Sequence, residues 1–263
     1  MRKILIFHWY DNNLDELNLF QKIHLYYFNK FKHIFDKIVI SISTNNMNNS
    51  EHINNIKKLF IDDNTNDIDF RLINNDPNLR ETSTFKKFIL DSNEFDNDYV
   101  FFAHSKQTDY TNTPESLSLW IGVMWYFNLT NLNDIIKKIN NKTKCISSGV
   151  IKACMGEGWR EHNKCKYDHI YAGTFFWLNM KKFKTINIDT TNVNRFFVEN
   201  IFANNIENQY CATSNNCDTS MLFLVDGGFD PYRNMKNMLP VLFTDTKLVE
   251  SFNEDFNIIF KNN

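Results

Sequence analysis

The chain has few of the residues that mark fibrous, disordered and disulfide-rich proteins. Its 263 residues include only 7 glycines and 4 prolines, which excludes collagen-like repeats and Gly/Pro-rich low-complexity chains. Its 5 cysteines are odd in number and form no Cys-x-x-Cys pair, so the pattern indicates neither a disulfide framework nor a zinc knuckle. No apolar run approaches the roughly 18 residues of a membrane-spanning helix.

An excess of charge of one sign is also absent. The 29 basic residues are balanced by 31 acidic ones, for a formal net charge of -2, so the chain lacks the global positive field of a nucleic-acid-binding protein. The first residues contain neither a long apolar core nor a small-residue cleavage site. We therefore expect a cytoplasmic protein with reduced thiols, in the host cytoplasm if the source is a virus, and no nucleic-acid partner.

Hydrophobic residues make up 43% of the chain, enough to bury the core of one large α/β domain. Short apolar runs, typical of strands buried on both faces, alternate with segments whose apolar residues recur every three or four positions, the period of an amphipathic helix. This alternation predicts a mostly parallel sheet flanked by helices. We expect strands at 3–10, 37–43, 68–74 and 98–106, and helices at 14–35, 51–61, 82–90, 114–127 and 132–139.

The second half of the chain is less regular. We expect strands near 145–152 and 172–179, a helix over 193–203, and a mixture of short elements from residue 217 onward. No linker and no internal repeat interrupts the sequence, so a single domain is the economical interpretation.

Polar residues follow the predicted parallel strands. The carboxyl ends of parallel strands meet at one edge of a sheet, where ligands bind in open α/β folds, so His8, Asn75 and His104 are candidates for one shared site. The sequence contains no P-loop, no GxGxxG after the first strand, no HExxH and no GxSxG. Kinase, dehydrogenase, zinc protease and serine hydrolase functions are therefore disfavoured.

Five motifs occur in a fixed order between residues 79 and 199. Residues 79–85 (LRETSTF) and 100–106 (VFFAHSK) are followed by 120–127 (WIGVMWYF), 168–177 (DHIYAGTFFW) and 195–199 (RFFVE). Together they resemble the Gly-Glu-x-x-Thr-Leu, His-Thr-Lys-Gly, Trp-x-x-x-Met-x-x-Phe, His-Tyr-Ser-Gly-Asn-Phe-Trp-Trp and Arg-x-x-x-Glu motifs of a family of GT-A-like glycosyltransferases of bacteria, phages and giant viruses. Arg80 and Gln107 stand where that family has Gly.

This resemblance implies a GT-A-like, Rossmann-like fold in a single domain, with a nucleotide-binding half over 1–110 and an acceptor half over 111–263. It implies transfer of a sugar from a nucleotide-diphosphate sugar to a hydroxyl of a glycan or other surface acceptor. The residues expected to bind the donor are His8, Asn75, Glu81, Thr84, His104, Ser105, Lys106 and Gly173.

Many GT-A enzymes hold Mn²⁺ or Mg²⁺ with an Asp-x-Asp at the position that reads His104-Ser-Lys106 here. Lys106 would neutralise the diphosphate directly and His104 would donate a hydrogen bond to it, so the sequence predicts no metal ligands and leaves metal dependence open. The alternative is an ordinary solvated strand end.

Glu81 and Thr84 either hold nucleoside hydroxyls or cap a helix. Gly173 either lets a sugar approach the backbone or forms a strand bulge.

Three residues are candidates for catalysis on the acceptor side. Glu199 either activates the acceptor hydroxyl or forms an i,i+4 ion pair with Arg195 on one helix face. Asp218 is the second carboxylate, and His169 has either a polar role near the acceptor or a structural hydrogen bond. Trp177 is either a sugar platform or, as its apolar neighbours favour, a core residue.

Two alternative functions stay open at this point. The missing Asp-x-Asp would fit a nucleotide-sugar-binding protein that has lost catalysis. A viral structural module that uses an aromatic surface over 120–127 for protein contacts would instead bind no nucleotide.

Overall fold

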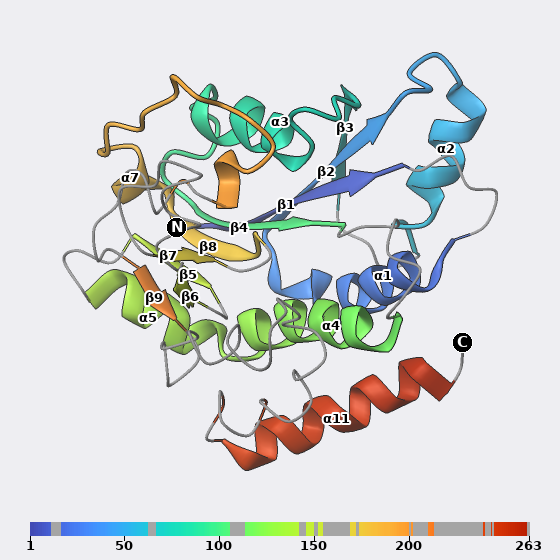
Figure 1. Ribbon diagram of the computed structural model, residues 1–263, viewed down its shortest axis with the longest axis vertical. Helices are drawn as coiled ribbons and strands as arrows, with labels where there is room; N and C mark the ends of the chain where they lie inside the picture. Colours follow the sequence, from blue (N-terminus) through green and yellow to red (C-terminus); the bar gives the residue numbers. More distant parts are fainter. Residues whose placement is uncertain are drawn as a thin grey trace, which may run out of the picture.

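The fold, seen in a computed structural model, is a seven-stranded sheet with helices on both faces (Figure 1). The structure describes residues 1–11, 17–62, 67–105, 114–141, 146–149, 152–154, 169–171, 174–199, 201, 210–212, 239, 243 and 245–261. The strands of the sheet are β1 (Lys3–Tyr10), β2 (Lys37–Thr44), β3 (Ile68–Asn74), β4 (Tyr99–His104), β5 (Ser147–Gly149), β8 (Phe176–Asn179) and β9 (Tyr210–Ala212). A separate two-stranded sheet pairs β6 (Lys152–Cys154) with β7 (His169–Tyr171).

The strand order is β3-β2-β1-β4-β8-β5-β9. The first four strands are parallel, β8 is antiparallel to both of its neighbours, and β9 is parallel to β5. The predicted α/β fold with a mostly parallel sheet is therefore confirmed. Because the chain runs outward from β1 to β3 and then returns to place β4 on the other side of β1, the order reverses between β1 and β4. Such a reversal is where open α/β sheets bind ligands, at the carboxyl ends of the strands.

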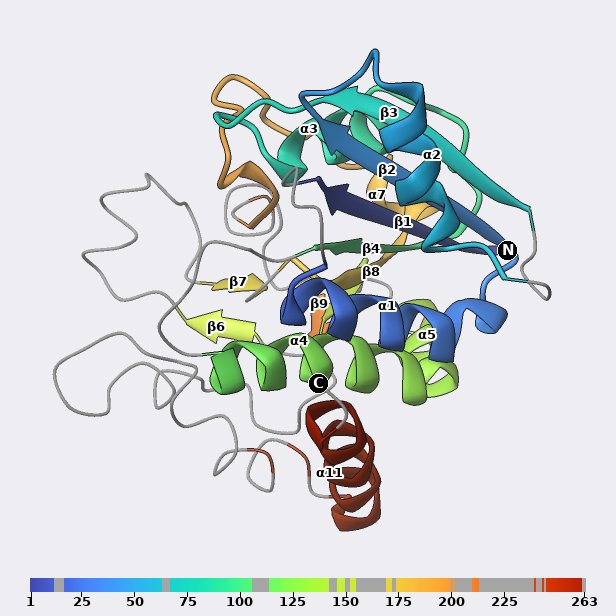
Figure 2. The same cartoon turned by 90° about the vertical axis from the view of Figure 1, so that its right-hand side faces the viewer.

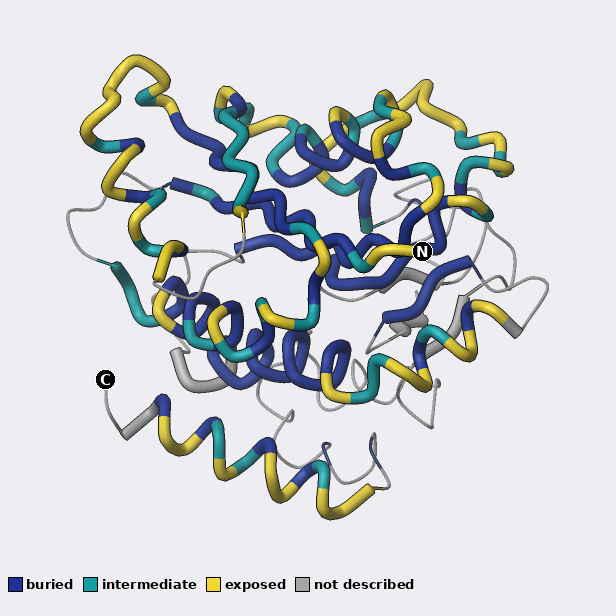
Figure 3. The backbone as a smooth tube through the Cα atoms, turned by 180° about the vertical axis from the view of Figure 1, so that it is seen from behind, coloured by how far each residue is buried: buried dark blue, intermediate teal, exposed yellow. Residues whose placement is uncertain are grey.

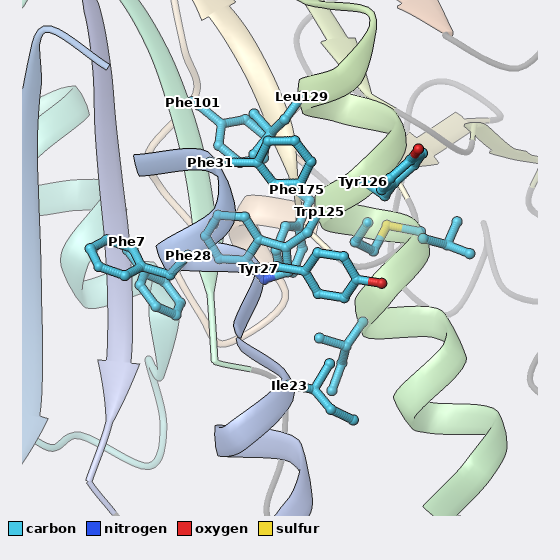
Figure 4. Packing of buried hydrophobic residues seen from close by; sticks show 14 of the residues in the cluster. Phe7, Ile23, Tyr27, Phe28, Phe31, Phe101, Trp125, Tyr126, Leu129 and Phe175 are labelled. Atoms are coloured by element: carbon cyan, nitrogen blue, oxygen red, sulfur yellow. The ribbon is translucent and has the colours of Figure 1, made fainter. Parts of the chain in front are cut away.

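Two hydrophobic clusters cover the two faces of the sheet. On one face, α1 (Leu19–Phe31), α4 (Pro114–Thr130) and α5 (Leu132–Asn141) pack against the sheet, and Figure 2 shows them below it. Rings from α1, α4, β1 and β4 meet in this cluster, among them Phe7, Phe101 and Trp125 (Figure 4). On the other face lie α3 (Glu81–Phe85), the π-helical turn Lys86–Leu90 and α7 (Met180–Phe183).

The expected elements of the first 140 residues are present. The first helix begins at Leu19 rather than near residue 14, because Asn18 and Gln21 form a capping box at its start. A 3-10 turn, Lys32–Ile34, ends it. The second helix, α2 (Ser50–Lys58), is capped by Asn49. The aromatic segment 120–127 of α4 is buried throughout, so it offers no aromatic surface of the kind that the alternative of a viral structural module required.

A long C-terminal helix, α11 (Thr246–Lys261), corrects the expectation of short elements from residue 217 onward. Its buried side chains, Val249, Phe252, Phe256 and Ile259, join the cluster under α4, and Figure 3 shows the buried and exposed positions alternating along it. An ion pair between Lys30 and Asp255 ties it to α1. The helix therefore adds a layer outside α1 and α4.

Candidate functional site

A row of polar side chains crosses the sheet near the carboxyl ends of its parallel strands. His8 on β1 pairs in register with His104 on β4 and with Ser41 on β2. Side chains alternate between the two faces of a strand, and the residues two and four positions earlier on β1, Ile6 and Ile4, belong to the cluster under α3. The row therefore lies on the α3 face, and it directly follows that apolar cluster toward the carboxyl ends of the strands.

Helix α3 joins this row through Thr84. The Thr84 hydroxyl lies 2.7 Å from His8 Nδ1 and 2.8 Å from Ser41 Oγ. All three side chains are buried, with His8 only 3% exposed. Burial, and secondarily the nearby His104, lowers the pKa of His8 to about 3, so its imidazole is neutral at pH 7. Thr84 thus anchors α3 to β1 and β2, and it does not cap a helix.

Ser105 locks the ends of β1 and β4 together. Its hydroxyl accepts a hydrogen bond from the backbone N–H of Tyr10 at 2.7 Å, and its own N–H donates to the carbonyl of His8 at 2.7 Å. The two strands are therefore held in register up to their last residues.

His104 lies between two elements. Its Nδ1 is 3.9 Å from Glu81 Oε1 on α3, and its ring is 5.5 Å from the ring of Phe175, just before β8. Both His104 and Glu81 are buried, at 7% and 8% exposure. Glu81, at the first position of α3, therefore contacts the row.

The backbone is strained at the two residues that directly precede Glu81 and Phe175. Arg80 has φ 49° and ψ -129°, and Thr174 has φ 50°; no other non-glycine residue in the described part of the chain has a positive φ. Such conformations cost about 1–3 kcal/mol each and persist only where the surrounding structure holds them. Arg80 directly precedes Glu81, and Thr174 directly precedes Phe175, so each strained residue is bonded to a residue that contacts His104.

A second polar cluster lies at the same edge, on the opposite face. Asp11, the residue after β1, is buried, and its Oδ2 accepts hydrogen bonds of 2.7 Å from Thr44 Oγ1 and from His52 Nε2. His52 stands in the first turn of α2. The carboxyl edge of β1 and β2 therefore carries polar groups on both faces of the sheet.

Of the eight residues expected to bind the donor, five meet around the row: His8, Glu81, Thr84, His104 and Ser105. Asn75 follows β3 at the same edge, where its N–H donates to the Thr44 carbonyl at 3.2 Å. Lys106 and Gly173 lie outside the described residues.

The structure describes two of the three residues expected to act in catalysis. Glu199 is half-buried at the end of the helical residues 197–199. Arg195 precedes this helix and stacks its guanidinium on the Phe196 ring at 4.4 Å, so the expected shared helix face of Arg195 and Glu199 was wrong. His169 lies on β7, in the separate two-stranded sheet. Asp218 lies outside the described residues.

Trp177 is a core residue, as its neighbours favoured. It is fully buried and its Nε1 donates to the Asn128 carbonyl at 3.0 Å. Within the described ranges, no three His, Cys, Asp or Glu side chains are grouped as metal ligands. No helix among these residues is long and apolar enough to cross a membrane.

The sequence interpretation missed Ser41, Asp11, Thr44 and His52. A signal for the serine was available, because Ser41 and Ser43 alternate with isoleucines in a strand that is otherwise apolar, and a buried strand carries hydroxyls at a cost unless they bond. The strain at Arg80 and Thr174 has no sequence signal beyond the unusual Arg at a position where the resembling family has Gly.

Comparison with known proteins places this chain in no family. No family model matches the sequence, and no curated protein matches it. Among solved structures, the fold is similar to that of a 4-diphosphocytidyl-2C-methyl-D-erythritol synthase, with 10% sequence identity and a TM-score of 0.32. The match covers 60% of this chain and 62% of that chain, less than two thirds of the length of its neighbour.

Proposed function

We propose that this chain is a glycosyltransferase that moves a sugar from a nucleotide-diphosphate sugar to a hydroxyl group of a glycan or other surface acceptor. The observation that carries the proposal is the in-register polar row of His104, His8 and Ser41 at the point where strand order reverses. A nucleotide bound at this edge would lie at the carboxyl ends of these three adjacent strands, next to the polar layer that Thr84 of α3 completes.

The chemistry requires three things of the chain. The leaving diphosphate must be neutralised, the donor sugar oriented, and the acceptor hydroxyl deprotonated if the anomeric centre is inverted. We assign neutralisation to Lys106 and hydrogen bonding to His104. The acceptor side is assigned to Glu199, with Asp218 and His169 as further candidates, and Gly173 is assigned to close approach of a sugar.

A ligand panel tests the proposal directly. Thermal unfolding is measured with UDP, GDP, CDP and ADP, with their sugar conjugates, and with the matching nucleosides as controls, each with and without Mn²⁺. At a concentration about 100 times its Kd, a ligand adds about 2.7 kcal/mol of stability, which raises the Tm of a chain of this size by several degrees. A donor that stabilises is then incubated alone and with glycan acceptors, and release of the nucleoside diphosphate is followed.

Stabilisation by a diphosphate and its sugar conjugate, but not by the nucleoside, supports the proposal. Binding without release of the diphosphate in either incubation would leave the nucleotide-sugar-binding alternative in its place. Absence of stabilisation by every diphosphate and sugar nucleotide would refute it.

A further inference from the structure

We propose that Arg80 and Thr174, the two strained residues that directly precede contacts of His104, contact the ligand: the Arg80 guanidinium binds the diphosphate and the Thr174 hydroxyl hydrogen-bonds the sugar. This inference rests on the proposed function, because it names the groups that meet the donor at the same edge of the sheet.

The first observation is that the residues following the two strained positions both contact His104. Glu81, bonded to Arg80, approaches His104 at 3.9 Å, and Phe175, bonded to Thr174, contacts the His104 ring at 5.5 Å. Glu81 and Phe175 lie about ninety positions apart in sequence, yet both contact the same histidine of the polar row, and each directly follows a strained residue. Strained backbone clusters in this way at ligand-binding sites.

The second observation concerns the Thr174 side chain. It is fully buried, and its hydroxyl has no hydrogen-bond partner in the described part of the chain. A buried hydroxyl without a partner is costly, and a β-branched residue is poorly suited to a positive φ. Glycine would remove both costs. A hydroxyl that hydrogen-bonds a sugar in the donor complex accounts for threonine at this position.

The third observation concerns Arg80. Its backbone is held by a hydrogen bond of 2.7 Å from its N–H to the Asp76 carbonyl, and its carbonyl accepts from the Ser83 hydroxyl at 2.6 Å. These bonds fix the strained conformation, while the half-buried guanidinium forms no ion pair or hydrogen bond with the described residues. The guanidinium is therefore unpaired among these residues, and the diphosphate of a bound nucleotide would be an anionic partner for it.

The experiment measures stability and ligand affinity in the same variants, because substitution by glycine should raise the Tm and weaken ligand binding. Arg80→Gly and Thr174→Gly each relieve the backbone strain, so each should raise the Tm by about 2–4 °C. Calorimetry should show Arg80→Gly weakening UDP and inorganic pyrophosphate binding about tenfold, and Thr174→Gly weakening a UDP-sugar about fivefold while leaving pyrophosphate unchanged. If the panel above selects another nucleotide, that nucleotide and its sugar conjugate replace UDP.

Three matched variants separate charge, hydroxyl and strain. Arg80→Lys keeps the charge and the strain, so it should retain most pyrophosphate affinity without raising the Tm. Thr174→Ser keeps the hydroxyl and should retain sugar-nucleotide affinity. Lys87→Ala removes an exposed charge from the neighbouring turn and should leave all affinities unchanged.

Three outcomes overturn the inference, and they differ in what they imply for the proposed function. If the wild-type chain binds a nucleoside diphosphate and both glycine variants bind it and its sugar conjugate equally well, this inference fails and the proposed function stands. If the wild-type chain binds none of the probes, both fail. A Tm that falls in both glycine variants together with affinity would show that the two residues are structural.

Discussion

The buried imidazole of His8 predicts a specific acid sensitivity. Its pKa is about 3 in the folded chain against an ordinary value of 6.5, so between these two pH values the unfolded chain binds the extra proton. The depressed folded pKa contributes stability that is present above pH 6.5 and is lost as the pH falls toward 3. Between pH 7 and pH 5 the loss attributable to His8 is about 2 kcal/mol of unfolding free energy.

The variant His8→Asn tests this magnitude. The asparagine side chain can hydrogen-bond Thr84 from about the position of the imidazole Nδ1, but it does not titrate. Urea unfolding followed by tryptophan fluorescence at pH 7, 6 and 5 and constant ionic strength should show the variant losing about 2 kcal/mol less than the wild-type chain over this range. Lower stability of the variant at pH 7 is expected from lost packing and does not affect the comparison.

A second buried histidine also contributes to the pH dependence. His24 is also buried, and burial lowers its pKa well below 6.5, so the wild-type chain should lose more stability than His8 alone accounts for. If His8→Asn and the wild-type chain lost the same free energy between pH 7 and pH 5, the neutral buried imidazole would be refuted.

Three further perturbations follow from the structure. A Cβ at Gly122 would lie 3.0 Å from the hydroxyl oxygen of Tyr27, so Gly122→Ala should destabilise the chain by about 1–3 kcal/mol. That hydroxyl is buried and has no hydrogen-bond partner among the described residues, so Tyr27→Phe alone should leave stability unchanged. In thermal unfolding, the double variant should recover part of the stability that Gly122→Ala loses. The pKa of Glu94 is lowered to about 2, chiefly by its hydrogen bond with Arg71. Glu94→Gln should therefore lower the unfolding free energy by less than about 1 kcal/mol at pH 7, and the difference between variant and wild type should shrink as the pH falls from 4.5 toward 2. A difference in urea unfolding that stays the same over this pH range would contradict the prediction. Glu199→Gln should lower turnover about a hundredfold with folding nearly unaffected if Glu199 acts on the acceptor, and unchanged turnover would remove it from the site.

The sequence alone determined most of the first half of the fold. Strand β3 was predicted at its observed bounds because apolar runs and helical periodicity are local properties that need no partner to be recognised. Helix α11 carries the same kind of signal, with Val249, Phe252, Phe256 and Ile259 at three- and four-residue steps. Its omission was an error of interpretation, since the required pattern is present in the sequence.

Only the tertiary structure decided the site. His8, Ser41 and His104 form one row because three strands, separated by up to about a hundred residues, pair in one register, and a shift of one residue would send each side chain to the opposite face. Arg80 and Thr174 adopt positive φ values that their own side chains disfavour. Local preference opposes these conformations, so they exist only because the packed structure around His104 holds them.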